Sequence, residues 1–180
     1  MAKLNSFDDY MTKLTQMWMI LQNYTVELGV VSNDSKRKSV KIDVSKEGLT
    51  NAELMFIHEN GSPLRNIPAR PVLSMTIENA VKKIMPYYLK QIEKSIIDDT
   101  ATQQSIETYL GQMCMDIQSY AQQLIANNDG RLAPNAPSTI KSKGYNHPLF
   151  KTGQLERSIT CHLIKKWVSF FQTIIYNYNI

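Results

Sequence analysis

The stretch of residues 58–73, HENGSPLRNIPARPVL, limits the possible folds of this chain more than any other part. It carries one glycine and three prolines, namely Gly61, Pro63, Pro68 and Pro71. Glycine commonly ends a helix, and a proline fixes its own φ and favours extended geometry at the residue before it. We therefore expect a stiff connector that is not helical. Because it also carries Arg65 and Arg70, we expect it to be positioned for a contact.

The composition is that of one domain with a sizeable core. The chain has 180 residues, of which 43% are apolar, and a modest formal charge of +4. We treat 1–180 as a single domain. Within it we expect an N-terminal helix at 1–23, an α+β core at 24–166, and an apolar arm or extra strand at 167–180.

Two features bear on where the protein is made. Cys114 and Cys161 lie far apart in the sequence, and we expect them to be reduced, packed thiols of a protein made in the cytosol. The N-terminal residues lack the apolar region of a signal peptide, and the apolar runs are too short and too interrupted to cross a bilayer. We therefore expect no membrane partner.

The first part of the chain predicts a helix followed by a β-hairpin. Apolar residues recur at helical spacing through 7–22, and Ser6 is placed to cap this helix. The apolar stripe consists of Phe7, Met11, Leu14, Trp18 and Leu21. Alternating residues at 24–30 and 40–44 predict two paired strands, with the basic run 36–38 at the tip of the turn.

Two helices are predicted on either side of the first connector. Thr50 and Glu53 match a capping box, so a short helix begins there and Gly61 ends it. A long apolar stripe through 72–97 predicts a second helix. Pro86 lies inside this helix and should kink it, because proline lacks the N–H that a regular helix uses.

A further helix and a second connector follow. Helical spacing resumes near Ser105, and residues 127–130, NNDG, are a clear stop. The short loop between the two long helices predicts an antiparallel pair. The connector at 131–153 is again rich in proline and glycine, and Ser138 and Thr152 are each placed to cap a single helical turn.

The last part of the chain predicts one more strand and an apolar segment. Residues 159–165 alternate as a strand does, whereas 167–180, WVSFFQTIIYNYNI, has no clean period. The latter is either a last strand that pairs with the first hairpin or an arm that docks on a neighbour. The predicted fold class is α+β, with a small antiparallel sheet packed against long helices and proline-rich connecting loops.

The sequence contains no constellation typical of catalysis or metal binding. The pair His58-Glu59 begins like the zinc-protease motif HExxH, but Ser62 occupies the place of the second histidine. Cys161 and His162 are neighbours in a predicted strand, where successive side chains point to opposite faces. There is no glycine-rich phosphate loop and no activated nucleophile. We therefore predict no enzyme, no metal and no cofactor.

Basic loops leave one alternative function open. Cationic side chains bind the phosphates of a nucleic acid, and an aromatic ring beside them can stack on a base. The second connector and its surroundings contain such a group: Arg131, Lys141, Lys143, Tyr145, Lys151 and Arg157. This loop and the basic run at 36–38 are consistent with a nucleic-acid-binding module. The simpler interpretation is a solvated loop, or a loop that binds an acidic protein surface.

Two blocks of sequence resemble one protein family. Residues 57–73, IHENGSPLRNIPARPVL, resemble its HExG and IPARPF(L) motifs, and residues 133–159, APNAPSTIKSKGYNHPLFKTGQLERSI, resemble its LSPxTIxxKGxxxPLxDTGxLxxSI motif. The family is that of the tailed-bacteriophage minor tail, tail-completion or neck proteins of the head–tail joining region. The blocks occur in the family's order, and the resemblance covers roughly residues 50–165.

The sequence departs from the family pattern in three respects. Phe150-Lys151 stands where the family usually has an acid before Thr-Gly, so any salt bridge of that acid is lost here. Val72 replaces the common phenylalanine and provides a smaller apolar anchor. The segment between the two blocks is also longer than usual.

The resemblance implies a virion structural protein without catalysis. Such proteins assemble as a ring, commonly six-fold, at the end of the tail tube or between connector and tail. The implied partners are further copies of the chain and the phage neck, connector and tail-tube proteins, whereas DNA passes through the lumen without specific binding. The implied location is the tail or neck of the virion, after synthesis in the bacterial host cytoplasm.

The resemblance also implies a set of interface or motif residues. They are His58, Glu59, Gly61, Arg65, Ile67, Pro68, Arg70, Pro71, Lys141, Lys143, Gly153 and Leu155. We expect Arg70 to pair with a carboxylate, either Glu59 in the same fold or a carboxylate of an adjacent subunit. We expect Gly153 to permit a tight turn and Leu155 to pack in the core.

Overall fold

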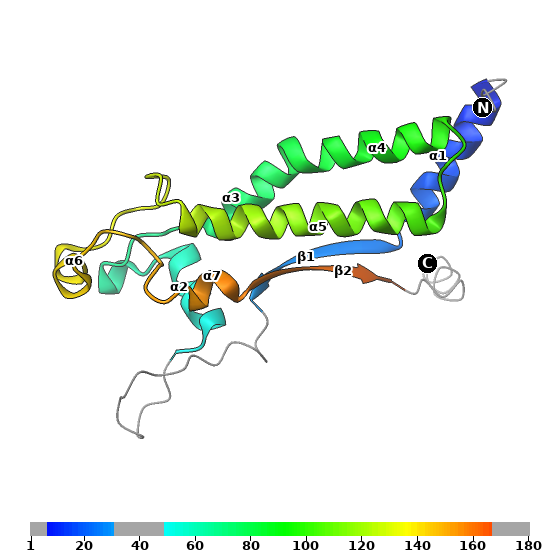
Figure 1. Cartoon of the computed structure of the whole chain (residues 1–180). Helices are drawn as coiled ribbons and strands as arrows, with labels where there is room; N and C mark the ends of the chain where they lie inside the picture. Colours follow the sequence, from blue (N-terminus) through cyan, green and yellow to red (C-terminus); the bar gives the residue numbers. More distant parts are fainter. Residues whose placement is uncertain (1–6, 31–48, 167–180) are drawn as a thin grey trace, which may run out of the picture.

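The computed structural model describes residues 7–30 and 49–166 (Figure 1). Helix α5 lies at its centre, between a helical rod on one side and a two-stranded sheet on the other. The rod consists of α3 (Val72–Asn79), a π-helical segment (Ala80–Ile84) and α4 (Met85–Ile97). The central helix α5 spans Gln103–Ala126, and the strands are β1 (Tyr24–Val30) and β2 (Ile159–Lys165). The predicted α+β class, with a small antiparallel sheet on long helices, is confirmed.

The kink predicted at Pro86 takes the form of the π-helical segment that directly precedes it. The N–H of Met85 donates to the carbonyl of Ala80, five residues earlier, where a regular α-helix would use the residue four earlier. A proline ring at position 86 collides with the carbonyl of Lys82 in a regular helix, and the wider turn relieves this contact. As a result the rod bends between α3 and α4 (Figure 1).

Helix α5 begins and ends near the predicted positions. The Thr102 hydroxyl accepts the backbone N–H of Ser105 at 3.0 Å, and the Ser105 hydroxyl accepts that of Thr102 at 2.8 Å, so two N–H groups at the start of α5 are satisfied. At the other end, Asn128 and Gly130 adopt positive φ values and stop the helix. The helices α4 and α5 form the predicted antiparallel pair (Figure 1).

The sheet joins two strands that are distant in the sequence. β1 and β2 are antiparallel, with Tyr24 opposite Lys165 and Val30 opposite Ile159. The predicted strand at 159–165 is therefore confirmed. The predicted hairpin strand at 40–44 and the segment 167–180 lie outside the described residues.

Two apolar clusters lie along α5. The first packs α4 and both strands against one half of α5, and its fully buried members include Ile92 and Ile106. The second packs α2 (Asn51–Asn60), α3 and the end of the sheet against the other half, and its fully buried members include Val72, Leu124 and Ile159. Burial of one such side chain contributes about 1.5–3 kcal/mol relative to an exposed one.

Helix α1 (Phe7–Leu21) is present where it was predicted, but its apolar stripe is largely exposed. Phe7 and Trp18 expose 74% and 67% of their surfaces. Leu21 of the stripe packs against the first cluster together with Met17 and Ile20, which lie outside the stripe. Polar contacts to α4 and the loop after it complete the attachment: the Tyr10 hydroxyl donates to Glu93 at 2.9 Å, and Lys13 Nζ donates to Asp99 at 2.7 Å. The predicted cap, Ser6, lies outside the described residues.

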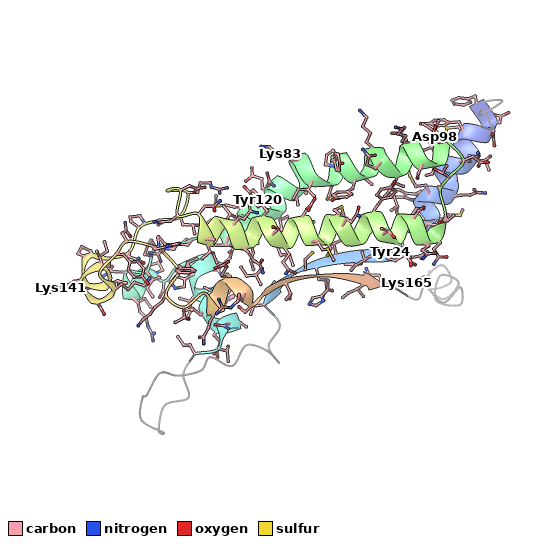
Figure 2. The ribbon with its side chains drawn as sticks, viewed as in Figure 1. Tyr24, Lys83, Asp98, Tyr120, Lys141 and Lys165 are labelled. Carbon is pink, nitrogen blue, oxygen red and sulfur yellow. The ribbon has the colours of Figure 1, made fainter. Side chains whose placement is uncertain are left out.

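Glu107 of α5 connects the start of β1 to the end of β2. Its carboxylate accepts hydrogen bonds from the Tyr24 hydroxyl, from Gln103 Nε2 at 3.0 Å and from Lys165 Nζ at 3.1 Å. Tyr24 and Lys165 lie at the same end of the sheet (Figure 2). These donors, with Tyr24 the largest contributor, lower the pKa of Glu107 to about 2.

Replacing Glu107 with glutamine should weaken the dependence of stability on acid pH. A carboxyl group whose pKa is lowered in the fold stabilises it above the unfolded value of 4.5, and this contribution is lost as pH falls toward about 2. We expect the melting temperature of the wild type to exceed that of Glu107→Gln at pH 6, and the difference to shrink between pH 4.5 and 2. Glu27→Gln, at an exposed position of β1, is the control. A difference that is constant over this range contradicts the role given to Glu107.

Candidate interaction site

The two proline-rich connectors meet at the end of the molecule opposite α1 (Figure 1). The first connector joins α2 to α3. The second, residues 131–153, follows α5, contains the short helix α6 (Pro137–Lys143) and ends at α7 (Gln154–Arg157), which leads into β2. This end of the fold therefore holds both sequence blocks that carry the phage resemblance.

The first connector is a closed loop. Ser62 and Ile67 exchange two backbone hydrogen bonds of 2.8 and 3.0 Å, and between them run a single 3-10 turn (Pro63–Arg65) and the left-handed Asn66. The expectation that no part of 58–73 is helical is wrong for this turn, because proline fits the first position of a helical turn. It is also wrong at the two ends of the stretch, where the last residues of α2 and the first two of α3 are helical. Leu64, at the tip, is fully exposed.

Gly61 ends α2 as predicted and is required by the geometry there. Its φ is 73°, in the left-handed region that favours glycine. A Cβ atom added to Gly61 would lie 2.8 Å from the backbone nitrogen of Ala69 and 3.0 Å from the carbonyl oxygen of Ile67. The two arms of the loop therefore approach each other at a distance that admits no side chain at this position.

Arg70 connects the first connector to the second. Its side chain is only 4% exposed, and it donates from Nε to the carbonyl of Ala133 and from Nη2 to that of Pro134, both at 2.7 Å. Nη1 lies 3.2 Å from His58 Nδ1, and the Arg70 N–H donates to the His58 carbonyl at 2.6 Å. Burial lowers the pKa of Arg70. One guanidinium group thus holds the end of α2 and the second connector together.

The expected pair between Arg70 and Glu59 does not form. The Glu59 carboxylate instead accepts the backbone N–H groups of Leu73 and Ser74, at 2.9 and 2.8 Å, and the Ser74 hydroxyl at 2.6 Å. These N–H groups belong to the first turn of α3, where no preceding residue of that helix can accept them, and the helix dipole favours a negative charge there. Pro71, which precedes α3, has no side chain able to cap it. Glu59 performs this role from the neighbouring helix.

Replacing Glu59 with alanine should lower the free energy of unfolding by about 1–2 kcal/mol, the usual cost of removing a helix cap. Urea unfolding followed by circular dichroism measures this change. Glu78→Ala is the matched control, because Glu78 is also on α3 but pairs only with Lys82 at the exposed surface. Equal losses in the two variants would mean that Glu59 is not a cap.

In the second connector, Lys143 is a structural residue and Lys141 is exposed. Lys143 Nζ donates to the carbonyls of His147 and Phe150, at 2.9 and 2.7 Å, and so closes the loop after α6. Burial, together with repulsion from Lys151 and Arg70, lowers its pKa. Lys141 projects from the α6 end of the molecule (Figure 2).

The two predicted caps in this connector are wrong. Helix α6 begins at Pro137, so Ser138 lies inside it, because proline is already suited to the first helical position. Helix α7 begins after Gly153 rather than after a capping Thr152. Gly153 has φ 71° and makes the expected tight turn, and Leu155, at 2% exposure, packs in the core as expected.

A pocket of about 350 Å³ lies between the connectors. Five of the predicted residues line it: His58, Ile67, Pro68, Arg70 and Lys143. Glu59, Gly61, Arg65, Pro71, Lys141, Gly153 and Leu155 do not. Lys151, which with Phe150 stands where the family usually has an acid, also lines the pocket, and none of the described residues that line it is an Asp or Glu. Arg70 and Lys143 already donate to backbone carbonyls, so the pocket combines two engaged cations with the side chain of Lys151.

Sequence reasoning missed two features. Cys114 on α5 and Cys161 on β2 are neighbours in space although they are far apart in the sequence, and burial is the main reason that the pKa of each thiol is raised. Both cysteines are free. The second feature is an apolar groove between β1 and the rod, lined by residues of α1, β1, α5 and all three parts of the rod. No local sequence pattern marks it, because segments that are far apart in the sequence contribute to it.

Neither a membrane-spanning helix nor a cluster of metal ligands lies within the described ranges. Among residues 7–30 and 49–166, no helix is both long and apolar enough to cross a bilayer. Over the same ranges, no three His, Cys, Asp or Glu side chains gather as metal ligands would. No family model, curated protein or solved structure matches the chain.

Proposed function

We propose that this chain is a non-catalytic structural protein of a tailed-phage virion. In this proposal it is a tail-completion or neck component that forms a ring at the head–tail junction or at the tail end. Its partners are further copies of itself and the neighbouring neck, connector and tail-tube proteins.

The contact of Arg70 with Ala133 and Pro134 is the observation that supports this proposal most. Arg70 belongs to the first block of the phage resemblance and the two carbonyls belong to the second. A chance resemblance in two separate segments gives no reason for the segments to touch through a buried charged side chain. The junction therefore favours treating the two blocks as one structural unit.

The chemistry of this end of the fold also suits contact with another protein. The first connector is closed by the Ser62–Ile67 bridge, and the second by Lys143, so both loops are ordered before binding. Preordered loops lose little conformational entropy on association. The pocket between them is cationic, and the exposed Leu64 and Arg65 stand on the loop beside it.

Immunogold electron microscopy tests the proposal directly. Antibodies against the purified chain are applied to intact phage particles from a lysate in which the gene is expressed from the phage genome. Gold at the neck or tail end is the expected result. Particles that infect normally and contain none of the chain by mass spectrometry contradict the proposal.

A titration with duplex DNA separates the proposal from the nucleic-acid alternative. Of the basic residues expected to bind phosphate, Lys143 is already engaged with two carbonyls, and the run at 36–38 lies outside the described residues. We expect weak binding at physiological salt and no change in the Lys141→Ala variant. Tight binding with a steep dependence on salt, weakened by Lys141→Ala, would favour the nucleic-acid module instead.

A further inference from the structure

An apolar groove runs along α5 between β1 and the α3–α4 rod. Its cavity volume is about 530 Å³, and none of the described residues that line it carries a charge. The floor includes Leu110, Met113 and Ile117 of α5, and the rim includes Trp18 and Val81. Val81 is 58% exposed even though it is apolar.

A surface of this kind usually binds something apolar. A continuous apolar surface that stays open to water often marks an interaction site, and Trp18, Ile77 and Val81 of this groove are exposed. Because the groove offers no charged side chain, a charged occupant would lose its hydration without gaining an ion pair. The occupant should therefore be uncharged and rich in apolar or aromatic side chains.

The chain itself contains a segment of that composition. The apolar arm, residues 167–180, directly follows β2 and contains no Asp, Glu, Lys, Arg or His. It includes Trp167, Phe170 and Phe171, and aromatic side chains contribute most to buried contacts between proteins. We propose that the apolar arm of one copy binds in the apolar groove of a second copy.

The position of β2 favours a second copy over the same chain. Tyr24 both lines the groove and pairs with Lys165, and the Lys166 N–H donates to the Asn23 carbonyl at 2.6 Å. No residue of β2 lines the groove, so β2 and the groove lie on opposite sides of β1. An arm entering its own groove would have to reverse around the junction of α1 and β1 immediately after Lys166. The groove of a second copy requires no such reversal.

The proposed contact is heterologous, because the arm of one copy meets the groove of another, and it can therefore be repeated from copy to copy. Each copy has one arm to give and one groove to fill, which generates a ring when the rotation between copies closes. This inference rests on the proposed function for its biological role, since it identifies the contact by which copies of the proposed ring hold one another.

A complementation experiment with full-length variants tests the inference. Val81→Asp places a charge in the groove, Phe170→Asp places one in the arm, and Met115→Asp is the control, because Met115 is 73% exposed on α5 and lies outside the groove. We expect the wild type and Met115→Asp to associate in native mass spectrometry, and each of the other two variants to associate at least tenfold more weakly. A mixture of Val81→Asp and Phe170→Asp should form a heterodimer, because one partner keeps its arm and the other keeps its groove.

Several results would overturn the inference. They are a wild type that stays monomeric up to about 0.1 mM, single variants that associate as the wild type does, and a mixture that remains monomeric. If the mixture remains monomeric and both variants also melt at a lower temperature than the wild type, the arm binds in the groove of its own chain. Circular dichroism of each variant verifies its fold. If Val81→Asp does not fold, Val81→Cys and Phe170→Cys chains are mixed and oxidised, and absence of a disulfide-linked heterodimer that depends on both cysteines rejects the contact.

The arm–groove contact and the proposed function can be rejected independently of each other. If Val81→Asp enters virions and forms rings as the wild type does, the arm–groove contact is wrong and the proposed function stands. If the complementation succeeds but the chain is absent from phage particles, the contact stands and the proposed function is wrong.

Discussion

Replacing Arg70 with alanine should lower the free energy of unfolding by about 2–4 kcal/mol, the largest effect we expect from any single polar residue. The variant leaves the carbonyls of Ala133 and Pro134 without their donor and removes the contact to His58. Because Arg70 is only 4% exposed, water cannot easily replace the lost donors. Urea unfolding followed by circular dichroism measures the loss.

Two further variants isolate the cause. Arg70→Lys keeps the positive charge but has one ammonium group in place of a planar fork, so it cannot reach both carbonyls and the histidine in the same geometry. We expect it to lose at least half as much stability as Arg70→Ala. Arg65→Ala removes an exposed arginine from the same connector and should change stability by no more than about 0.5 kcal/mol. Equal effects of Arg65→Ala and Arg70→Ala would contradict the role of Arg70 in holding the two connectors together.

The Gly61→Ala variant should lower the free energy of unfolding by a similar amount, about 2–4 kcal/mol, because two costs add. The first is the positive φ of 73°, which together with ψ 177° lies in a region almost restricted to glycine and costs another residue about 1–3 kcal/mol. The second is the added Cβ atom, which would lie 2.8 Å from the backbone nitrogen of Ala69. Backbone cannot rotate away as a flexible side chain does, so the loop between Ser62 and Ile67 would have to shift.

Two other glycines separate these costs in the same chain. Gly130 has φ 86° but nothing within 4 Å of an added Cβ atom, so Gly130→Ala carries only the first cost. Gly29 has neither a positive φ nor a close neighbour, so Gly29→Ala should be nearly neutral. The predicted order of stability loss in urea unfolding is therefore Gly61, Gly130, Gly29. A loss at Gly61 no greater than that at Gly130 would show that the close approach is relieved without cost.

Local signals in the sequence were sufficient for most of the helices. The Thr50–Glu53 capping box, the stop at Gly61 and the NNDG stop after α5 each depend on a few adjacent residues, and all three are present in the structure. Pro86 likewise indicated an irregular helix, although its local chemistry did not distinguish a simple kink from a π-helical segment. Interactions between residues three or four positions apart are what a single sequence reports best.

The partners of distant residues were harder to predict. The alternation in 159–165 predicted a strand but not that it pairs with β1, because alternation reports a buried face and says nothing of the neighbouring strand. For Arg70 the sequence favours a carboxylate partner, either Glu59 as the nearest candidate in the same fold or a carboxylate of an adjacent subunit, because it shows side-chain charges only. The actual acceptors, the Ala133 and Pro134 carbonyls, are backbone atoms, and no choice of side chain reveals them.

The pairing of β1 with β2 also determines the order in which the fold can be completed. Thr160 and Gly29, which are partners in the sheet, are 131 positions apart in the chain. During synthesis the helical hairpin of α4 and α5 leaves the ribosome whole, whereas β1 has to wait for almost the entire chain before β2 is available. A nascent chain stalled before residue 159 therefore leaves the edge of β1 without the backbone partners that β2 supplies, and such truncated chains are natural substrates for chaperones and proteases.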